Sequence, residues 1–547
     1  MKRRVFFVLL LLTIMIPAYA QDGAVLLRST LTGDISNLNP IFSSDSASID
    51  VGSFLWRGLF ETDPQTALPI PDLATWEISE DGMTYTFSIR DDANWSDGAP
   101  ITSADVDFTY RAISAPDIPS PRKGNVELID SINIIDDKTF EVVLAASNCT
   151  VWGNTFGALT PLPSHVFADD FSDLVENAFN TEPNVTSGPY VVDEWQPDEF
   201  IRLRENPDFY GGDPQIPTIF NRVLVDTTIQ NQSLLTGEVD YVFMYPDQLE
   251  QLGGPDFLIP HVFSLNNTPM LIMNWADSAN PQNAYDEAGN LIEQDPNPFF
   301  GDVRVRQAVA MGYDKDAVLQ TLGPGGGARA AGPVTPSFAW AVADDVTGYE
   351  YNPARAAELL DEAGWIMNEE TGIREKDGLA FEVDLLYAEL VDLYTNIALI
   401  AQDQLGDIGI KLNVSIMEWS AYLTDVLLSQ KFDITIVGFG GGTEVDGIAY
   451  NILLSENDVA GSGFNLTSYV NPRVDELLKQ GRTLAGCDAD MRAEIYRELQ
   501  RIVYEEVAYD FTVVTNQVHV MNSRVTNFEP GPWNSAWQIP TWGITDG

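Results

Sequence analysis

Residues 381–440 read FEVDLLYAELVDLYTNIALIAQDQLGDIGIKLNVSIMEWSAYLTDVLLSQKFDITIVGFG and alternate between strand and helix patterns. Strands are predicted over 381–388, 410–418 and 432–439, and helices around 393–405 and over 419–430. A β-α-β-α-β series of this kind predicts a parallel sheet. Ligands of open α/β sheets bind at the carboxyl ends of the strands, so the residues after the last strand are candidates for a ligand site.

A glycine-rich loop follows that last strand, with Gly438 and Gly440–Gly442 ahead of two acids, Glu444 and Asp446. The loop lacks the Lys-Ser/Thr of a P-loop and does not fit the dinucleotide fingerprint. No helix-forming run follows closely enough to direct a helix N-terminus at a phosphate. A second glycine-rich stretch, residues 323–333, also lacks the Lys-Ser/Thr pair and precedes no predicted helix, and we interpret it as a surface loop.

The chain has 547 residues, more than one hydrophobic core can serve, so two or three lobes are expected. Its formal net charge is −52, which repels nucleic acid and anionic membranes. Such a charge could favour cationic ligands. The simpler interpretation is that the acids cover a solvated surface, as in salt-adapted or secreted proteins.

The first twenty residues have the pattern of a signal peptide. Lys2, Arg3 and Arg4 precede a short apolar run, and Ala18–Ala20 form an A-x-A cleavage signal. An uncleaved membrane anchor is the alternative, although the apolar run is short for a membrane span. Gln21 follows the predicted cut, so no lipid-modified cysteine is available there. The mature chain is expected to be exported to a periplasmic or other extracytoplasmic space.

Cysteine and histidine are too few and too dispersed to suggest a metal site. Cys149 and Cys487 are the two cysteines, and His165, His261 and His519 are the three histidines. A structural zinc site is therefore not expected, and neither is any other metal or cofactor. Export permits a disulfide, but the pairing of the two cysteines depends on the fold and stays open.

The sequence favours a binding protein over an enzyme. It contains no G-x-S-x-G elbow and no H-E-x-x-H motif, and its acids are too many for any one pair to be informative. His165, in an extended proline-rich turn, has a structural interpretation. Twelve tryptophans and nineteen tyrosines suit stacking on a small ligand, although most are expected in the core.

Several blocks of sequence, in order along the chain, resemble one protein family. The longest is ATWEISEDGMTYTFSIRDDANWSDGAPITSADVDFTYR, residues 74–111. The others are SGPYVVDEW (187–195), LRENPDFYGGDP (203–214), LLTGEVDYV (234–242), VRQAVAMGYDKDAVL (305–319), YNPARAAELLDEAGW (351–365) and NPRVDELLKQG (471–481). Together they resemble the extracellular solute-binding proteins of family 5, the dipeptide- and oligopeptide-binding proteins of ABC importers.

The resemblance implies an α/β, two-lobed periplasmic-binding-protein fold of type II (class C), with an extra β-rich domain and hinge closure on the ligand. The implied division is a signal peptide (1–20), lobe I (21–63, 187–263 and 501–547), an inserted domain (64–186) and lobe II (264–500). The implied partners are a small-molecule solute, membrane permease subunits and, indirectly, their ATPase. The resemblance implies no catalysed reaction and no nucleic acid, and we expect a monomer.

The resemblance also directs attention to the loop after the strand at 432–439. In peptide binders of the family the equivalent strand ends in Gly-Trp, and an Asp a few residues later pairs with the α-ammonium of the peptide. Here the Trp position is Phe439, and the Asp position falls on Gly442 or Thr443. Glu444 or Asp446 could substitute only if the longer loop re-aims one of them. The other candidate ligand-binding residues are Trp419, which resembles an aromatic lining the family's cavity, and Gly440, Gly441, Ser43, Ser44 and Asn274.

The cargo therefore stays open between two classes. A peptide or oligopeptide is slightly favoured because it is the commonest ligand of the family. An oligosaccharide is the close alternative, since a glycine-lined loop with Trp419 suits aromatic platforms and neutral polar groups. Free nickel is least favoured, given the dispersed histidines. An exported enzyme or a sensor receptor on the same fold is a more distant alternative.

Overall fold

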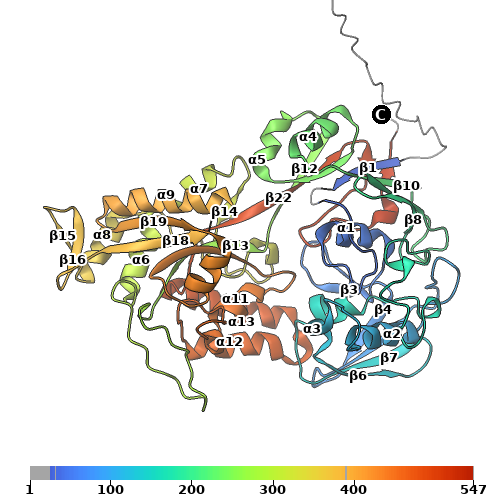
Figure 1. Ribbon diagram of the computed structural model, residues 1–547, viewed down its shortest axis with the longest axis horizontal. Coiled ribbons are helices and arrows are strands. Elements are labelled where there is room, and N and C mark those ends of the chain that lie inside the picture. Colours follow the sequence, from blue (N-terminus) through green and yellow to red (C-terminus); the bar gives the residue numbers. More distant parts are fainter. Residues whose placement is uncertain (1–24, 31–32, 389–390, 546–547) are drawn as a thin grey trace, which may run out of the picture.

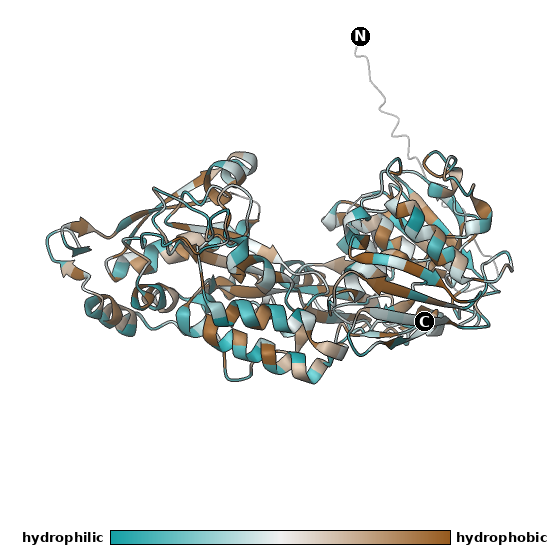
Figure 2. Cartoon of the chain, turned by 90° about the horizontal axis from the view of Figure 1, so that it is seen from below, coloured by the Kyte–Doolittle hydropathy of each residue, from teal (hydrophilic) through white to brown (hydrophobic). Residues whose placement is uncertain are grey.

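The computed structural model describes residues 25–30, 33–388 and 391–545, so the predicted signal peptide lies outside the described residues. The molecule is elongated, with one lobe at each end of its long axis and a narrower junction between them (Figures 1 and 2). In the part of the chain that is described, no helix is both long and apolar enough to cross a membrane.

Lobe I is built on an eight-stranded sheet that gathers segments from both ends of the chain. Its strand order is β12-β22-β11-β1-β10-β9-β8, with β14 also pairing with β22. The strands are β1 (Val25–Thr30), β8 (Tyr190–Gln196), β9 (Phe200–Glu205), β10 (Thr218–Val223), β11 (Tyr241–Met244), β12 (Leu258–Ser264), β14 (Gly327–Arg329) and β22 (Val513–Asn522). Helices α1 (Ser46–Leu55), α4 (Thr227–Thr236) and α5 (Pro246–Leu249) pack against it, and β23 (Val525–Thr526) pairs with β24 (Gly543–Ile544).

A second sheet extends lobe I at the lower right of Figure 1. Its order is β4-β5-β7-β6, all antiparallel. Its strands are β4 (Ala74–Ile78), β5 (Thr84–Ile89), β6 (Ile129–Ile134) and β7 (Thr139–Leu144); α2 (Ser103–Ser114), α3 (Lys123–Val126) and the hairpin of β2 (Phe60–Thr62) and β3 (Pro69–Pro71) accompany them. Tyr85, Phe87 and Ile89 alternate inward and join one continuous core with the main lobe.

Lobe II contains the parallel sheet predicted from residues 381–440. Strands β18 (Glu382–Ala388), β19 (Lys411–Met417) and β20 (Ile434–Gly440) are mutually parallel, with β18 in the middle, which confirms that prediction. Strand β13 (Asn267–Met273) joins antiparallel to β20, and β21 (Asp510–Phe511) closes the sheet. A small sheet of β15 (Ile366–Asn368), β16 (Ile373–Lys376) and β17 (Leu379–Ala380) lies at the end of this lobe.

Both faces of this sheet are covered by helices. Alternate residues of β13 divide between two cores, with Leu271 and Met273 in one and Met270 and Ile272 in the other, as the two-residue period of a strand requires. The helices are α6 (Val303–Gly312), α7 (Lys315–Gln320), α8 (Pro353–Glu362) and α9 (Asp392–Asp407), and α11 (Gly447–Leu453), α12 (Pro472–Thr483) and α13 (Ala489–Glu506). The helix predicted over 419–430 is instead a short α10 (Trp419–Ala421) followed by a π-helical segment, Tyr422–Leu427.

The chain crosses between the lobes at two neighbouring places. The first crossing lies between β12 and β13, and the second runs along β22, whose Val513 and Val514 pack in the cores of lobe II and whose Val518 and Val520 pack in lobe I (Figure 1). The two crossings lie side by side, since Leu265 donates its backbone N–H to the carbonyl oxygen of Thr515 (2.9 Å). Two short strand connections side by side are the arrangement in which a hinge can absorb a rotation of one lobe against the other.

Candidate ligand-binding site

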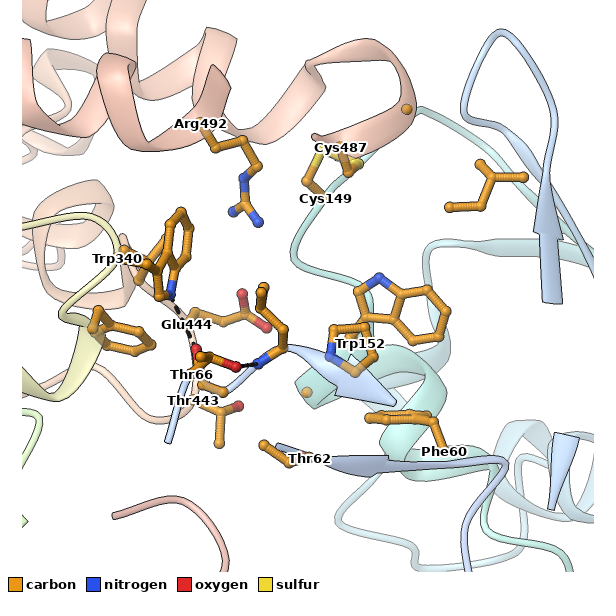
Figure 3. Close-up of a pocket in the computed structure, with 18 of the residues that line it drawn as sticks. Phe60, Thr62, Thr66, Cys149, Trp152, Trp340, Thr443, Glu444, Cys487 and Arg492 are labelled. Atoms are coloured by element: carbon orange, nitrogen blue, oxygen red, sulfur yellow. Dashed lines mark hydrogen bonds between the residues drawn. A yellow bond between two sulfur atoms is a disulfide. The ribbon is translucent and has the colours of Figure 1, made fainter. Parts of the chain in front are cut away.

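A cavity of about 170 Å³ lies between the two lobes, and residues of both lobes line it (Figure 3). Lobe I contributes Phe60, Thr62, Thr66, Ala67, Leu68, Pro69, Trp76, Ile78, Cys149, Trp152 and Gly153. Lobe II contributes Phe338, Trp340, Thr443, Glu444, Val445, Gly486, Cys487 and Arg492. Cavities between lobes are preferred ligand sites because both walls can contact the ligand at once.

Aromatic side chains form much of the wall. In lobe I, the Trp152 ring lies 4.5 Å from that of Trp76 and 5.2 Å from that of Phe60, measured between centroids. Across the cavity, Trp340 of lobe II donates its indole N–H to the backbone oxygen of Thr66 (3.0 Å). Rings held in this way offer flat apolar surface without a large loss of conformational entropy.

Glu444 is the acid that enters the cavity. The loop after β20 is held by Asn266, whose side-chain amide donates to the backbone oxygens of Gly442 (2.9 Å) and Glu444 (3.4 Å). The Glu444 side chain then points inward, toward Arg492 (Figure 3). Burial, together with the charge of Asp446, raises the pKa of Glu444 to about 8, although Arg492, a hydrogen bond from the backbone N–H of Gly153 in lobe I, and Arg482 act in the opposite direction.

Asp446, two residues later, is held inside lobe II. It is fully buried, and its carboxylate accepts hydrogen bonds from Arg482 Nε (2.8 Å) and Nη2 (3.4 Å). The Arg482 guanidinium also lies 3.3 Å from the centroid of the Tyr450 ring. A carboxylate with these partners is not available to a ligand. Of the two acids in the loop, Glu444 therefore lines the cavity and Asp446 does not.

Arg492 gives the same cavity a cationic group. Its Nε donates to the backbone oxygen of Gly481 (2.9 Å) and its Nη2 to the hydroxyl of Tyr496 (3.2 Å). The cavity therefore offers partners for a cationic and for an anionic group of one ligand, between aromatic walls.

The structure brings two of the predicted site residues, Thr443 and Glu444, into this cavity. Gly440, Gly441 and Gly442 form the strand end and turn just before them, with Gly442 at a φ of +59°. Phe439 is half-buried and packs edge-on against Phe464, 5.8 Å between centroids. Trp419, 37% exposed, begins α10.

The remaining predicted residues lie outside the cavity lining. The Ser43 hydroxyl is buried and donates to the backbone oxygens of Asn37 (2.7 Å) and Asn39 (2.9 Å). Ser44 is exposed, and the buried Asn274 amide donates to the Gln430 oxygen (3.1 Å). Contact of these residues with a ligand stays a prediction.

Sequence reasoning missed Trp152, Trp340 and Arg492. Trp152 begins a short π-helical segment (Trp152–Phe156), Trp340 lies in a turn, and Arg492 lies in α13. The three meet only through tertiary packing, so no local pattern distinguishes them from core aromatics or surface arginines. The cysteine pairing that the sequence left open is resolved, because Cys149 and Cys487 form a disulfide in the cavity wall.

Two α/β lobes, a paired strand crossing and a lined cavity between the lobes define a class, the two-lobed binding proteins. Within that class the chain belongs to the bacterial extracellular solute-binding proteins, family 5, whose middle region it matches over residues 69–461.

The comparisons with individual proteins agree with this assignment. The oligopeptide-binding protein AppA of Bacillus subtilis is 26% identical over 527 residues, covering 96% of this chain and 92% of AppA. The solved structure of AppA with a nonapeptide covers 96% of this chain and 100% of that one, at 25% identity and a TM-score of 0.66. The structure of HbpA2 from Haemophilus parasuis shares the fold, with a TM-score of 0.79, 19% identity, and coverage of 95% and 100%.

Proposed function

We propose that this protein captures peptides with a free amino terminus between its two lobes and delivers them to the permease subunits of an ABC importer. The observation that carries the proposal is the Glu444 carboxyl group inside the interlobe cavity. It supplies the acid that is absent at Gly442 and Thr443. The names of the relatives, oligopeptide-binding and ABC transporter peptide-binding proteins, support the same cargo class.

The chemistry of an α-ammonium group explains why this carboxyl group matters. Burying an ammonium ion without a partner is very costly, so a peptide site needs an anion at that point. Because its pKa is raised, the Glu444 carboxyl group is largely protonated near neutral pH when no ligand is bound. An incoming ammonium favours the ionised form, and binding should therefore release a proton.

The size of the cavity limits what it can enclose in this arrangement of the lobes. Its volume of about 170 Å³ is below the roughly 300–1,000 Å³ of sites for drug-sized ligands. It suits the amino-terminal end of a peptide, and a longer chain would require the lobes to separate further. The division of the chain at 64, 187 and 264 into lobes and an inserted domain is part of the same proposal. The boundary predicted at 501 falls inside α13 of lobe II, so we place the return to lobe I along β22.

The test is retention from mixed peptide pools. Two samples of the protein, one with the Cys149–Cys487 disulfide intact and one with it reduced, are incubated with a pool of short peptides and with the same pool after amino-terminal acetylation. They are then dialysed and analysed by native mass spectrometry. We expect retention from the free-amine pool only, in at least one of the two redox states. Equal retention from both pools, or no retention from the free-amine pool in either redox state, would contradict the proposal.

Glu444→Gln tests the named residue, and Glu369→Gln, at an exposed position of lobe II, is the matched control. We expect the first variant to lose most retention of free-amine peptides and the second to retain them as the wild type does. A Glu444→Gln protein that keeps full retention would remove this residue from the ligand contacts.

An oligosaccharide is the second candidate, and the aromatic wall of Trp76, Trp152 and Trp340 favours it. A sugar stacks on such rings and needs no buried acid. The same retention experiment with an oligosaccharide pool separates the two. Selective retention of sugars by the wild type and by Glu444→Gln alike would establish the alternative, and conversion of any retained solute would indicate an enzyme.

A further inference from the structure

The disulfide between Cys149 and Cys487 joins the two lobes to each other. Cys149 follows β7 in lobe I, and Cys487 lies in the short turn between α12 and α13 of lobe II. The two residues are 338 positions apart in the sequence. The bond therefore links two parts of the chain that are distant in sequence and belong to different lobes.

This bond is a third covalent connection between the lobes, beside the two strand crossings. The crossings lie near β22, whereas the disulfide lies where the α12–α13 turn meets the part of lobe I beside α3 (Figure 1). Both cysteines belong to the cavity wall (Figure 3). A rotation about the strand crossings that widens the cavity would have to separate Cys149 from Cys487, and the bond opposes that motion.

The noncovalent contacts between the lobes near the disulfide are hydrogen bonds and one apolar cluster, in which Ala67 and Trp533 of lobe I pack with Phe338, Trp340 and Val445 of lobe II. Cys149 donates its backbone N–H to the Arg482 oxygen (2.6 Å), and Trp340 binds the Thr66 oxygen. Trp533 of lobe I packs on Phe338, 4.6 Å between ring centroids, and donates to the Ser337 oxygen (3.0 Å). Each such hydrogen bond contributes about 0.5–1.5 kcal/mol, and hydrogen bonds and apolar contacts, unlike the disulfide, can break and re-form as the lobes move.

We propose that the Cys149–Cys487 disulfide is a redox latch that holds the lobes closed around the cavity, and that its reduction frees them to open. The proposal rests on the lobe motion of a solute-binding protein and is independent of the cargo. Disulfides persist in oxidising compartments outside the cytoplasm, which suits an extracellular family.

The geometry indicates which sulfur atom a reductant reaches. Cys149 is buried, at 2% exposure, whereas Cys487 is half-buried and follows the exposed Ala485 and Gly486. A thiolate of a dithiol reductant attacks Cys487 Sγ, forms a mixed disulfide and releases Cys149 as a thiol after proton uptake. The second thiol of the reductant then displaces Cys487, so the reductant is oxidised by two electrons and the protein gains two thiols. The Leu484 carbonyl oxygen, 3.3 Å from Cys149 Sγ, can accept the bond of the released thiol.

X-ray scattering of the full chain tests the latch, because it measures lobe separation without a ligand. Three samples are compared: the oxidised wild type, the wild type reduced with an excess of dithiol, and the Cys149→Ser/Cys487→Ser variant. Alkylation and mass spectrometry verify the thiol count, and each sample is dialysed until native mass spectrometry shows no retained solute. We expect a larger radius of gyration for the second and third samples, and a return to the smaller value when the wild type is reoxidised.

Equal radii of gyration in oxidised and reduced wild type would overturn the latch. Loss of secondary structure on reduction, measured by circular dichroism, would also overturn it, because the bond would then hold the fold and not the lobe position. If the double variant fails to fold, the comparison of radii of gyration between oxidised and reduced wild type is the test. A failure of peptide retention leaves this experiment unaffected, so the two proposals fail separately.

Discussion

Glu444 and Asp446 are two residues apart, and the fold gives them opposite environments. Asp446 is matched with Arg482, so its negative charge is compensated inside lobe II. Glu444 lines the cavity, where the charge of Asp446 raises its pKa and the charge of Arg492 lowers it. An acid kept largely neutral by burial is a group that a cationic ligand can ionise, whereas a fully paired acid is part of the scaffold.

The raised pKa of Glu444 predicts a pH dependence of stability. The folded chain holds this proton more tightly than the unfolded chain, where the pKa is near its usual 4.5. The stabilising contribution is thus complete below pH 4.5 and is lost as pH rises toward 8, by at most about 1.4 kcal/mol per pH unit. Because His519, whose pKa burial lowers to about 4, titrates in an overlapping range, the difference between wild type and Glu444→Gln is the quantity to measure.

We expect that difference in the free energy of unfolding, from urea titrations between pH 5 and pH 8, to grow in favour of Glu444→Gln as pH rises. Glutamine keeps the shape of the protonated acid and cannot ionise. A difference that stays constant across this range would contradict the raised pKa.

The Asp446–Arg482 pair predicts a strong effect of removing one partner. Asp446→Asn leaves the Arg482 guanidinium, whose side chain is 22% exposed, without its anion. We expect a loss of about 3 kcal/mol in the free energy of unfolding. The control is Glu494→Gln, which removes a carboxylate that is 72% exposed from its pair with Arg497. It should cost at most about 1 kcal/mol, because Arg497 keeps its hydrogen bonds to the backbone oxygens of Trp340 and Val342. Similar losses in the two variants would show that the buried pair has no special role.

At the scale of the element, the turn after β20 determines where Glu444 lies. A Cβ atom on Gly447 would overlap the carbonyl oxygen of Gly441, whereas a Cβ atom on Gly442 would meet open space. Gly447→Ala therefore has to displace the turn itself. Gly442→Ala meets only the cost of a left-handed backbone at φ +59°, about 1 kcal/mol.

We expect Gly447→Ala to weaken peptide retention by native mass spectrometry, because Glu444 moves with the turn, and to cost more stability than Gly442→Ala. Retention unchanged in Gly447→Ala, or the reverse order of stabilities, would indicate that the turn does not position the carboxyl group.

The elements of residues 381–440 were largely predictable. Two other expectations were wrong, because α11 begins at Gly447, directly after the glycine-rich loop, and β14 lies within residues 323–333, which we interpreted as a surface loop. Apolar alternation in 381–440 predicts β18, β19 and β20 and their parallel arrangement, because period and connection type are local properties. The π-helical segment Tyr422–Leu427 was not predictable, since a helical pattern does not distinguish i→i+4 from i→i+5 bonding. The choice of Glu444 over Asp446 was also out of reach, because it depends on Arg482, 36 residues away in sequence.

At the scale of the molecule, charge predicts a response to salt. With 81 acidic against 29 basic residues, the folded chain repels itself, and salt screens that repulsion. We expect the melting temperature to rise between about 0.01 M and 1 M sodium chloride, over which the Debye length falls from about 30 Å to about 3 Å. Sucrose at matched osmolality is the control for solvent effects. A melting temperature that is flat or falls with salt would contradict this.

A solute held at the cavity around Glu444 would contact both lobes at once. Hydrogen exchange with and without a peptide recovered from the free-amine pool measures this double contact. We expect the amides of residues 60–69 and 152–153 in lobe I to become protected together with those of residues 338–340 and 443–445 in lobe II. Protection confined to one lobe, or placed away from these segments, would contradict it.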